Sequence, residues 1–221
     1  MTNNNTPATN TPDQNDQNNQ NNQNDKNNQN TTPSFPPAAT AKEKSIIWPK
    51  IAEIADADFG FHDPREKTNI EKYGTRVLII NDEGKICVVK SDKNNYMQVT
   101  GGGIEPSESI YEGLRREAAE ETGYTLTDIR PLGYIYERRE DKLNTHDWER
   151  AVSFVFTAHP GENIGTHYMD DEIAEGFHPI WININDFLRE QESHDGRIEK
   201  YSGNFSNRRD IEMVKYYLNN K

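Results

Sequence analysis

The first 44 residues of this 221-residue chain restrict what it can fold into, because they offer almost nothing to bury. Asn, Gln, Thr, Pro and Asp dominate the segment, and no Leu, Ile, Val or aromatic residue precedes Phe35. Such a composition cannot bury enough apolar surface to offset the entropy lost on ordering. We therefore predict a disordered Asn/Gln-rich tail over residues 1–44 and one globular domain over residues 45–221.

Acidic residues outnumber basic ones, 37 Asp and Glu against 25 Lys and Arg, for a formal net charge of −12. This balance argues against a nucleic acid or an anionic membrane as a partner, and it suits a protein that recruits cations. No apolar run is long enough to cross a bilayer, and no secretory signal pattern is visible, so we expect a cytoplasmic protein. Cys87, the single cysteine, lies in an apolar run and is expected in the core, which excludes an internal disulfide.

Hydrophobic patterning and turn residues predict an α+β domain with helices packed on a mixed sheet. The Asn-Asp-Glu-Gly turn at residues 81–84 joins the first two strands into a hairpin. A short helix is expected between residues 48 and 61, where apolar residues recur at roughly helical spacing around Pro49. Strands are expected over residues 75–80, 85–90, 96–100, 132–136, 151–158 and 179–184, and further helices over residues 110–122, 185–190 and 207–219.

The segment over residues 110–122 carries the clearest helix signals. Ser109 and Glu112 form an S-x-x-E capping box at its start, and Gly123 is placed to end it. One face of the helix is apolar and is formed by Tyr111, Leu114 and Ala118. A core-facing amphipathic helix is therefore predicted here.

Three glutamates of this helix, Glu117, Glu120 and Glu121, stand at spacings i, i+3 and i+4 and share one face, turned away from the apolar stripe. Three like charges this close repel each other. Water can relieve the repulsion, and so can Mg²⁺ or Mn²⁺, which favour carboxylate oxygens. For an isolated acidic run, a solvated helix face would be the better interpretation.

The surrounding residues decide against a merely solvated face. Seven residues follow the pattern G-x5-E-x7-R-E-x2-E-E-x-G, which arises by chance about once in 10^8 trials at average residue frequencies. They are Gly102, Glu108, Arg116, Glu117, Glu120, Glu121 and Gly123. The pattern resembles the signature of the Nudix hydrolase family, G-x5-E-x7-R-E-U-x-E-E-x-G-U, in which U is a bulky aliphatic residue. The two U positions depart from it, with Ala118 and Tyr124.

The resemblance implies an α/β/α sandwich with a mixed sheet between helices, and a Mg²⁺ or Mn²⁺ cofactor. The implied metal ligands are Glu117, Glu120, Glu121 and the carbonyl of Gly101. In many members of the family one of the glutamates, here Glu120 or Glu121, or a carboxylate from a later loop acts as general base. In the acidic loop over residues 170–175, Glu172 is the first candidate and Glu175 the second.

Other residues receive supporting roles from the same resemblance. Arg116 matches the arginine that orients the carboxylates, and Glu108 matches a glutamate that supports the loop and helix. Gly102 permits the loop to bend back beside the helix, and Gly123 completes the motif. Arg138 and Arg139 follow a strand and could hold a substrate phosphate, although solvated strand-end charges are the more ordinary explanation.

The implied reaction is hydrolysis of the diphosphate linkage in a nucleoside diphosphate joined to another group, by a metal-activated water. The expected partner is thus a small nucleotide-type molecule. The alternative is a non-catalytic Nudix domain that senses a nucleotide. Isoprenoid diphosphate isomerisation, which shares the scaffold, relies on a catalytic cysteine that Cys87 is poorly placed to supply. The oligomeric state stays open, with a homodimer as one option, and deletion of residues 1–40 is expected to leave turnover unchanged.

Overall fold

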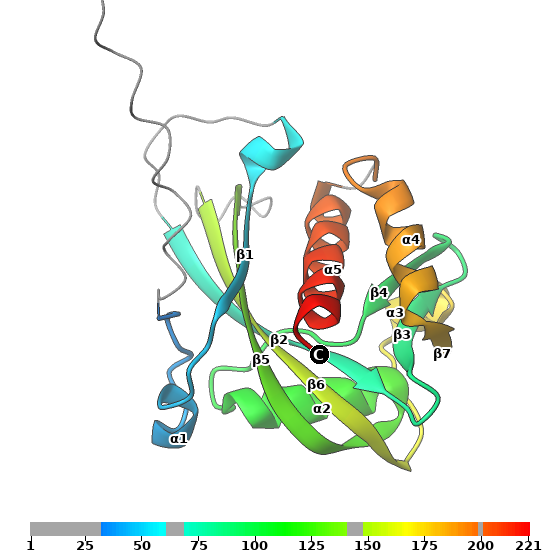
Figure 1. Ribbon diagram of the computed structural model, residues 1–221, viewed down its shortest axis with the longest axis horizontal. Coiled ribbons are helices and arrows are strands. Elements are labelled where there is room, and N and C mark those ends of the chain that lie inside the picture. The colour runs from blue at the N-terminus through cyan, green and yellow to red at the C-terminus, as the bar shows by residue number, and fades with distance from the viewer. Residues whose placement is uncertain (1–31, 61–68, 141–147, 199–200) are drawn as a thin grey trace, which may run out of the picture.

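The computed structural model describes residues 32–60, 69–140, 148–198 and 201–221. Within these ranges a seven-stranded mixed sheet carries helices on both faces (Figure 1). Helix α2 (Ile110–Thr122) covers one face, and α4 (Ile184–His194) and α5 (Tyr201–Asn220) cover the other. The arrangement confirms the predicted α+β sandwich. None of the helices described is both long and apolar enough to cross a bilayer.

The strands follow the order β1-β5-β6-β2-β3-β4, and β7 pairs with β3. The pairs β1–β5 and β2–β6 are parallel, and the others are antiparallel. The bounds are β1 (Lys50–Ala55), β2 (Asn69–Ile80), β3 (Lys85–Ser91), β4 (Tyr96–Val99), β5 (Tyr124–Glu140), β6 (Trp148–Asn163) and β7 (Phe177–Asn183).

Alternation along the central strands separates two cores, one on each face of the sheet. In β2, Val77 and Ile79 pack on the α2 side, whereas Leu78 packs towards α4 and α5. The neighbouring strand β6 repeats the pattern, with Phe154 on the α2 side and Val155 on the other. The sheet is therefore buried on both faces where β2 carries Val77 to Ile79, and a charged residue beside this stretch is unusual.

Several predicted elements are present with different bounds. Helix α2 occupies the predicted residues, but the strands expected over residues 132–136 and 151–158 are only the centres of the long strands β5 and β6. The last helix begins at Tyr201 and not at residue 207. The pattern did not predict α3 (Asp170–Ala174), because a five-residue helix is too short to show periodicity.

The segment expected to contain a short helix forms a strand instead. β1 pairs in parallel with β5, placing Ile54 opposite Glu137, and Ile54 is buried in the core on the α5 side. In the described part of the segment, only the 3-10 turn η1 (Asp56–Phe59) is helical. A short apolar run fits either a helix face or a strand, and the unpaired edge of β5 selects the strand.

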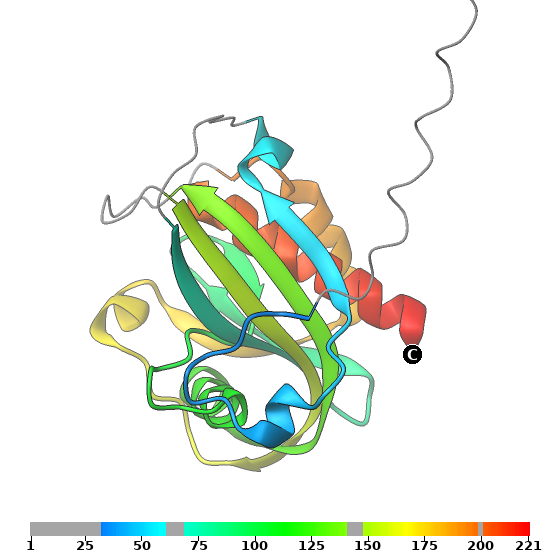
Figure 2. The same cartoon turned by 90° about the vertical axis from the view of Figure 1, so that its left-hand side faces the viewer.

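Residues 32–44 belong to the folded domain, which corrects the expected boundary at residue 44. The Phe35 ring stacks on Phe154 with 5.7 Å between centroids, and Ala39 is buried in the core on the α2 side. Helix α1 (Ala41–Lys44) follows and lies beside α2 (Figure 2). The segment has few apolar residues, but these pack on the core. Residues 1–31, most of the expected tail, lie outside the described residues.

Candidate active site

A loop of three glycines, residues 101–103, follows β4 and lies against β2. The Thr75 N–H donates to the Gly102 carbonyl at 3.0 Å. Gly101 has a φ of +134°, and a Cβ at this position would lie 2.1 Å from the Thr75 carbonyl oxygen. Only glycine therefore fits at position 101, and the backbone of the loop approaches β2 closely.

The N-terminus of α2 is capped by two separate parts of the chain. The Glu112 N–H donates to Ser109 Oγ at 3.3 Å and the Ser109 N–H donates to the Glu112 carboxylate at 2.8 Å, which confirms the predicted capping box. The Tyr111 N–H donates to Glu43 Oε1 at 2.9 Å. Glu43 thus satisfies a helix-end amide and places a negative charge at the positive end of the helix dipole.

The C-terminus of α2 is held by the segment that leads into α3. Gly123 ends the helix with a φ of +74°, as the sequence predicted. The His167 N–H donates to the Glu120 carbonyl at 2.8 Å, and the Tyr168 hydroxyl donates to the Glu121 carbonyl. These bonds fix the backbone of the two glutamates themselves.

Arg116 links the glycine loop to the acidic face of α2. Its Nε and Nη2 donate to the two carboxylate oxygens of Glu108 at 2.7 and 3.0 Å. Nη2 also donates to the Gly103 carbonyl at 2.7 Å, and Nη1 donates to Glu117 at 2.8 Å and to Glu120 at 3.0 Å. The planar guanidinium can satisfy all of these acceptors at once. Arg116 therefore orients two of the three glutamates and anchors the loop.

Glu121 and Glu117 point towards the glycine loop, and burial disfavours the charged form of both. Glu121 is 7% exposed, and its carboxylate accepts the Gly101 N–H at 2.8 Å. Burial raises the pKa of Glu121 to about 8, and it also raises the pKa of Glu117. The Glu117 carboxylate lies over Gly102, where a Cβ would be 2.3 Å from Oε2. A bound cation would stabilise the charged form of both groups.

The two candidates in the acidic loop have different surroundings: the charge of Glu172 acts on Glu121, and the Glu175 carboxylate is bonded to Asn94. Burial is the main cause of the raised pKa of Glu121, and the charge of Glu172 adds to it. In its present position Glu172 accepts the Met169 N–H at 2.8 Å, at the start of α3. The Glu175 carboxylate accepts a bond from Asn94 Nδ2 at 3.0 Å and lies at the cavity described below.

Arg138 and Arg139 are not brought to the glutamates. The glycine loop lies beside Thr75, which is level in the sheet with Tyr134 of β5. Arg138 is four residues farther along β5, about 13 Å at strand spacing, and it is exposed. Arg139 is bound to Glu149, with 2.9 Å from Nε to the carboxylate. The geometry therefore does not support a phosphate-binding role for this pair at the glutamates.

Arg76 is a site residue that pattern reasoning missed. It lies in β2 within a run predicted as an apolar strand, and its Nη1 donates to the Gly102 carbonyl at 3.1 Å. The signal that could have revealed it is the charge itself, since a charged residue inside a strand buried on both faces needs a specific partner.

A divalent cation fits the donor chemistry of this site, although the three glutamates do not converge. In the part of the chain that the structure describes, no group of three or more His, Cys, Asp or Glu side chains is gathered closely enough to hold a metal ion. Glu117 and Glu120 face Arg116, and Glu121 faces the Gly101 N–H. Carboxylates are the ligands that Mg²⁺ prefers. Binding therefore requires Glu117 and Glu120 to turn from Arg116 towards Glu121.

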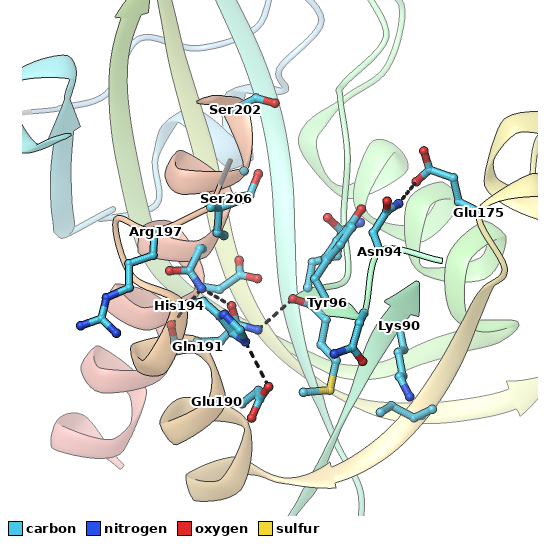
Figure 3. Close-up of a pocket in the computed structure, with 18 residues that line it drawn as sticks. Lys90, Asn94, Tyr96, Glu175, Glu190, Gln191, His194, Arg197, Ser202 and Ser206 are labelled. Atoms are coloured by element: carbon cyan, nitrogen blue, oxygen red, sulfur yellow. Dashed lines mark hydrogen bonds and ion pairs between the residues drawn. The ribbon is translucent and has the colours of Figure 1, made fainter. Parts of the chain in front are cut away.

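A cavity of about 850 Å³ lies between β4 and the helices α4 and α5. Figure 3 shows Tyr96 facing Gln191 and His194 across it, with Glu175 and Asn94 bonded to each other at one end. Amide, hydroxyl and aromatic side chains line it together with apolar ones. Its volume and mixed lining are typical of sites for small organic molecules.

Comparisons with solved structures find related folds at low sequence identity. A NUDIX hydrolase from Nitrosomonas europaea is 18% identical with a TM-score of 0.48, and the match covers 69% of this chain and 91% of that one. A MutT structure from work on Aliivibrio salmonicida and Vibrio cholerae is 16% identical with a TM-score of 0.41, covering 64% and 98%. A MutT NUDIX hydrolase from Burkholderia pseudomallei is 21% identical with a TM-score of 0.40, covering 52% and 85%.

Sequence comparisons are more direct. A putative 8-oxo-dGTP diphosphatase of Bacillus subtilis (strain 168) is 32% identical over 73 residues, which are 33% of this chain and 48% of the relative, so the chain matches about half of that relative's length. The model of the NUDIX domain matches residues 71–201. Because this match spans more than half of the chain and includes every residue of the glutamate signature, the protein belongs to the NUDIX domain family, as the spacing of those residues predicted.

Proposed function

We propose that this protein hydrolyses the diphosphate linkage of a nucleoside diphosphate joined to another group, with Mg²⁺ or Mn²⁺ as cofactor. The observation that carries the proposal is the complete set Glu117, Glu120 and Glu121 on a helix face that Arg116 orients. Both ends of that helix are held by capping contacts from elsewhere in the chain. A helix held at both ends can keep a reacting group in a precise position, which catalysis requires.

The ligands proposed for the cation are the three glutamates and the carbonyl of Gly101. The Gly102 and Gly103 carbonyls already accept bonds from Arg76 and Arg116. No hydrogen bond to the Gly101 carbonyl is found from any described residue, so this oxygen is the one left for a ligand. When bound, the cation neutralises phosphate oxygens and polarises water.

Carboxylates of this chain would accept the proton of the attacking water. Glu120 is suited by exposure, because 42% of its side chain is accessible, whereas Glu121 is buried. Glu172 is a second candidate, since it lies in α3 and its charge acts on Glu121. A positioned base of this kind contributes about 10² to 10⁴ in rate. Arg116 would keep the glycine loop and Glu108 in place through its bonds to Gly103 and Glu108 while the proton moves.

The nucleotide portion of the substrate would occupy the cavity between β4, α4 and α5. Its 850 Å³ falls within the range of pockets that bury most of a small organic ligand. Tyr96 offers a ring for stacking, and its pKa is raised by burial and then by the charges of Glu175 and Glu121. The charge of Glu121 therefore acts on one wall of the cavity, and Glu175 lines the cavity itself. The Bacillus subtilis relative is named for 8-oxo-dGTP, which makes oxidised purine nucleotides the first compounds to try.

The test is hydrolysis of a nucleotide panel with Mg²⁺ or Mn²⁺. The panel contains nucleoside triphosphates, 8-oxo-dGTP, ADP-ribose, dinucleoside polyphosphates and nucleotide sugars. We expect one class to be split at its diphosphate. The variants Glu120→Gln, Glu121→Gln and Glu172→Gln are compared with the control Glu162→Gln, in which an exposed glutamate is changed. Loss of about 100-fold or more in kcat marks a base or ligand, and the control should match the wild type. An intact rate in both Glu120→Gln and Glu121→Gln would refute the proposal.

A nucleotide-sensing domain without hydrolysis is the second candidate. The observation in its favour is that Arg116 donates hydrogen bonds to Glu117 and Glu120, so the described side chains do not form a ready metal site. This candidate predicts that a nucleotide from the same panel binds with an affinity that depends on metal, while no compound is cleaved. Calorimetric titration of the panel compounds separates the two candidates.

A further inference from the structure

Among the described residues, Arg76 is the only charged residue of β2 whose side chain bonds to the glycine loop. Its Nη1 donates to the carbonyls of Thr75, at 2.6 Å, and of Gly102, at 3.1 Å. Its Nε is buried without a hydrogen-bond partner among the described residues. Burial, with the nearby charge of Arg209, lowers its pKa to about 10, so the side chain stays positive at neutral pH. Because burial disfavours the charged form of this side chain, its presence here suggests a specific function.

The three loop glycines each make a different contact with the site. The Gly101 N–H donates to Glu121 at 2.8 Å, and the Gly103 carbonyl accepts from Arg116 at 2.7 Å. Gly102, between them, lies under the Glu117 carboxylate and presents its carbonyl to Arg76. A shift of the Gly102 peptide would therefore displace both neighbouring contacts. Arg116 holds the loop from α2, and Arg76 holds it from the opposite side, from β2.

The chain just before the loop is held from α5. Asp210 Oδ2 accepts the Val99 N–H at 2.8 Å, and Asp210 is 1% exposed. Its other oxygen lies 3.7 Å from Arg209 Nε, and Arg209 Nη1 is 3.2 Å from Glu137. The charges of Glu137 and Asp210 both act on Arg76. Arg76 therefore joins the glycine loop to a buried group of charges on the α5 side of the sheet.

We infer that Arg76 is a positioning residue, which fixes the Gly102 peptide and through it the placement of Glu117 and Glu121 for metal binding and turnover. The inference rests on the proposed function for its catalytic part. Lysine would keep the positive charge, but its flexible stem lacks the rigid planar group that holds Nη1 between the Thr75 and Gly102 carbonyls. Supporting residues of this kind change metal affinity by about 10- to 100-fold.

The experiment compares Arg76→Lys and Arg76→Gln with the matched control Arg130→Lys. The Arg130 side chain is 72% exposed and, among the described residues, pairs with Asp128 alone. Three readouts are taken well below the melting temperature: the Mn²⁺ dissociation constant by electron paramagnetic resonance without nucleotide, amide exchange over residues 100–104, and kcat and KM. We expect Arg76→Lys to weaken Mn²⁺ binding about tenfold or more and to speed loop exchange. We expect kcat to fall about 100-fold with little change in KM.

A purely structural role would lower the melting temperature of Arg76→Lys while Mn²⁺ affinity and kcat of the folded protein matched Arg130→Lys, and that result would overturn the inference. Arg76→Gln keeps one donor for the Gly102 carbonyl and serves if the lysine variant does not fold. A wild type that cleaves no panel compound would defeat the proposed hydrolase. Mn²⁺ affinity and loop exchange would still decide the role of Arg76.

Discussion

At the scale of single residues, the missing side chain at Gly102 makes room for the Glu117 carboxylate. A Cβ there would lie 2.3 to 2.5 Å from three atoms of that group. Because the obstructed atoms are the far end of a flexible side chain, Gly102→Ala should fold but push Glu117 aside. We expect Mn²⁺ affinity to fall about tenfold or more, measured by paramagnetic resonance. Gly103→Ala is the matched control, since nothing lies within 4 Å of its Cβ position, and equal affinities in the two variants would contradict this account.

The burial of Glu121 gives a second residue-scale prediction, on pH. Its pKa in the folded protein, about 8, lies above the ordinary glutamate value of 4.5. The stability this group contributes is complete below pH 4.5 and is lost as the pH rises towards 8. In EDTA, Glu121→Gln should therefore be more stable than the wild type at pH 8, by at least about 1 kcal/mol, and nearly equal to it at pH 5. Urea unfolding at both pH values measures this, and an unchanged difference between them would contradict it.

At the scale of elements, the segment before the family match acts as a brace for α2. Trp48 is 4% exposed and contacts Phe154 and Phe156, and Glu43 accepts the Tyr111 N–H. Deletion of residues 1–31 leaves these contacts intact and should not change stability. Deletion of residues 1–48 removes them and should lower the free energy of unfolding by more than about 3 kcal/mol. Denaturant titration tests both, and equal midpoints for the two truncations would contradict the brace.

The elements also show which local signals are strong enough to read. The helix over residues 110–122 was predicted with correct bounds, because its cap, its apolar stripe and its terminal glycine agree. β1 was wrongly predicted as a helix, since five of its six residues pair with β5 through contacts that no local pattern contains. Deletion of residues 1–40, expected from composition to be harmless, would remove the Phe35–Phe154 stacking. Its effect on the turnover of the folded protein stays a prediction.

At the scale of the whole molecule, buried charges connect α5 to the sheet. The side chains of Arg209 and Glu137 are 6% and 2% exposed and lie 3.2 Å apart. Arg209→Met would leave Glu137 and Asp210 without this partner, so we expect a loss of about 3 to 5 kcal/mol. Arg208 pairs with Asp195 nearer the surface, where both side chains are 28% exposed. Arg208→Met should therefore lower the free energy of unfolding by about 1 kcal/mol or less. Thermal and denaturant unfolding of both variants tests the contrast, and equal losses would refute it.

The sequence by itself determined the family, the acidic face of α2 and the roles of its capping residues, because these depend on spacings within one helix and its two ends. Tertiary structure decided the rest. It bonded Glu175 to Asn94 at the cavity, placed Arg138 far along β5 from the glycine loop, and brought Arg76 to that loop. These placements depend on strand order and register, which join segments far apart in the chain. No local pattern encodes them, since a strand shows only which face is buried and not which strand lies beside it.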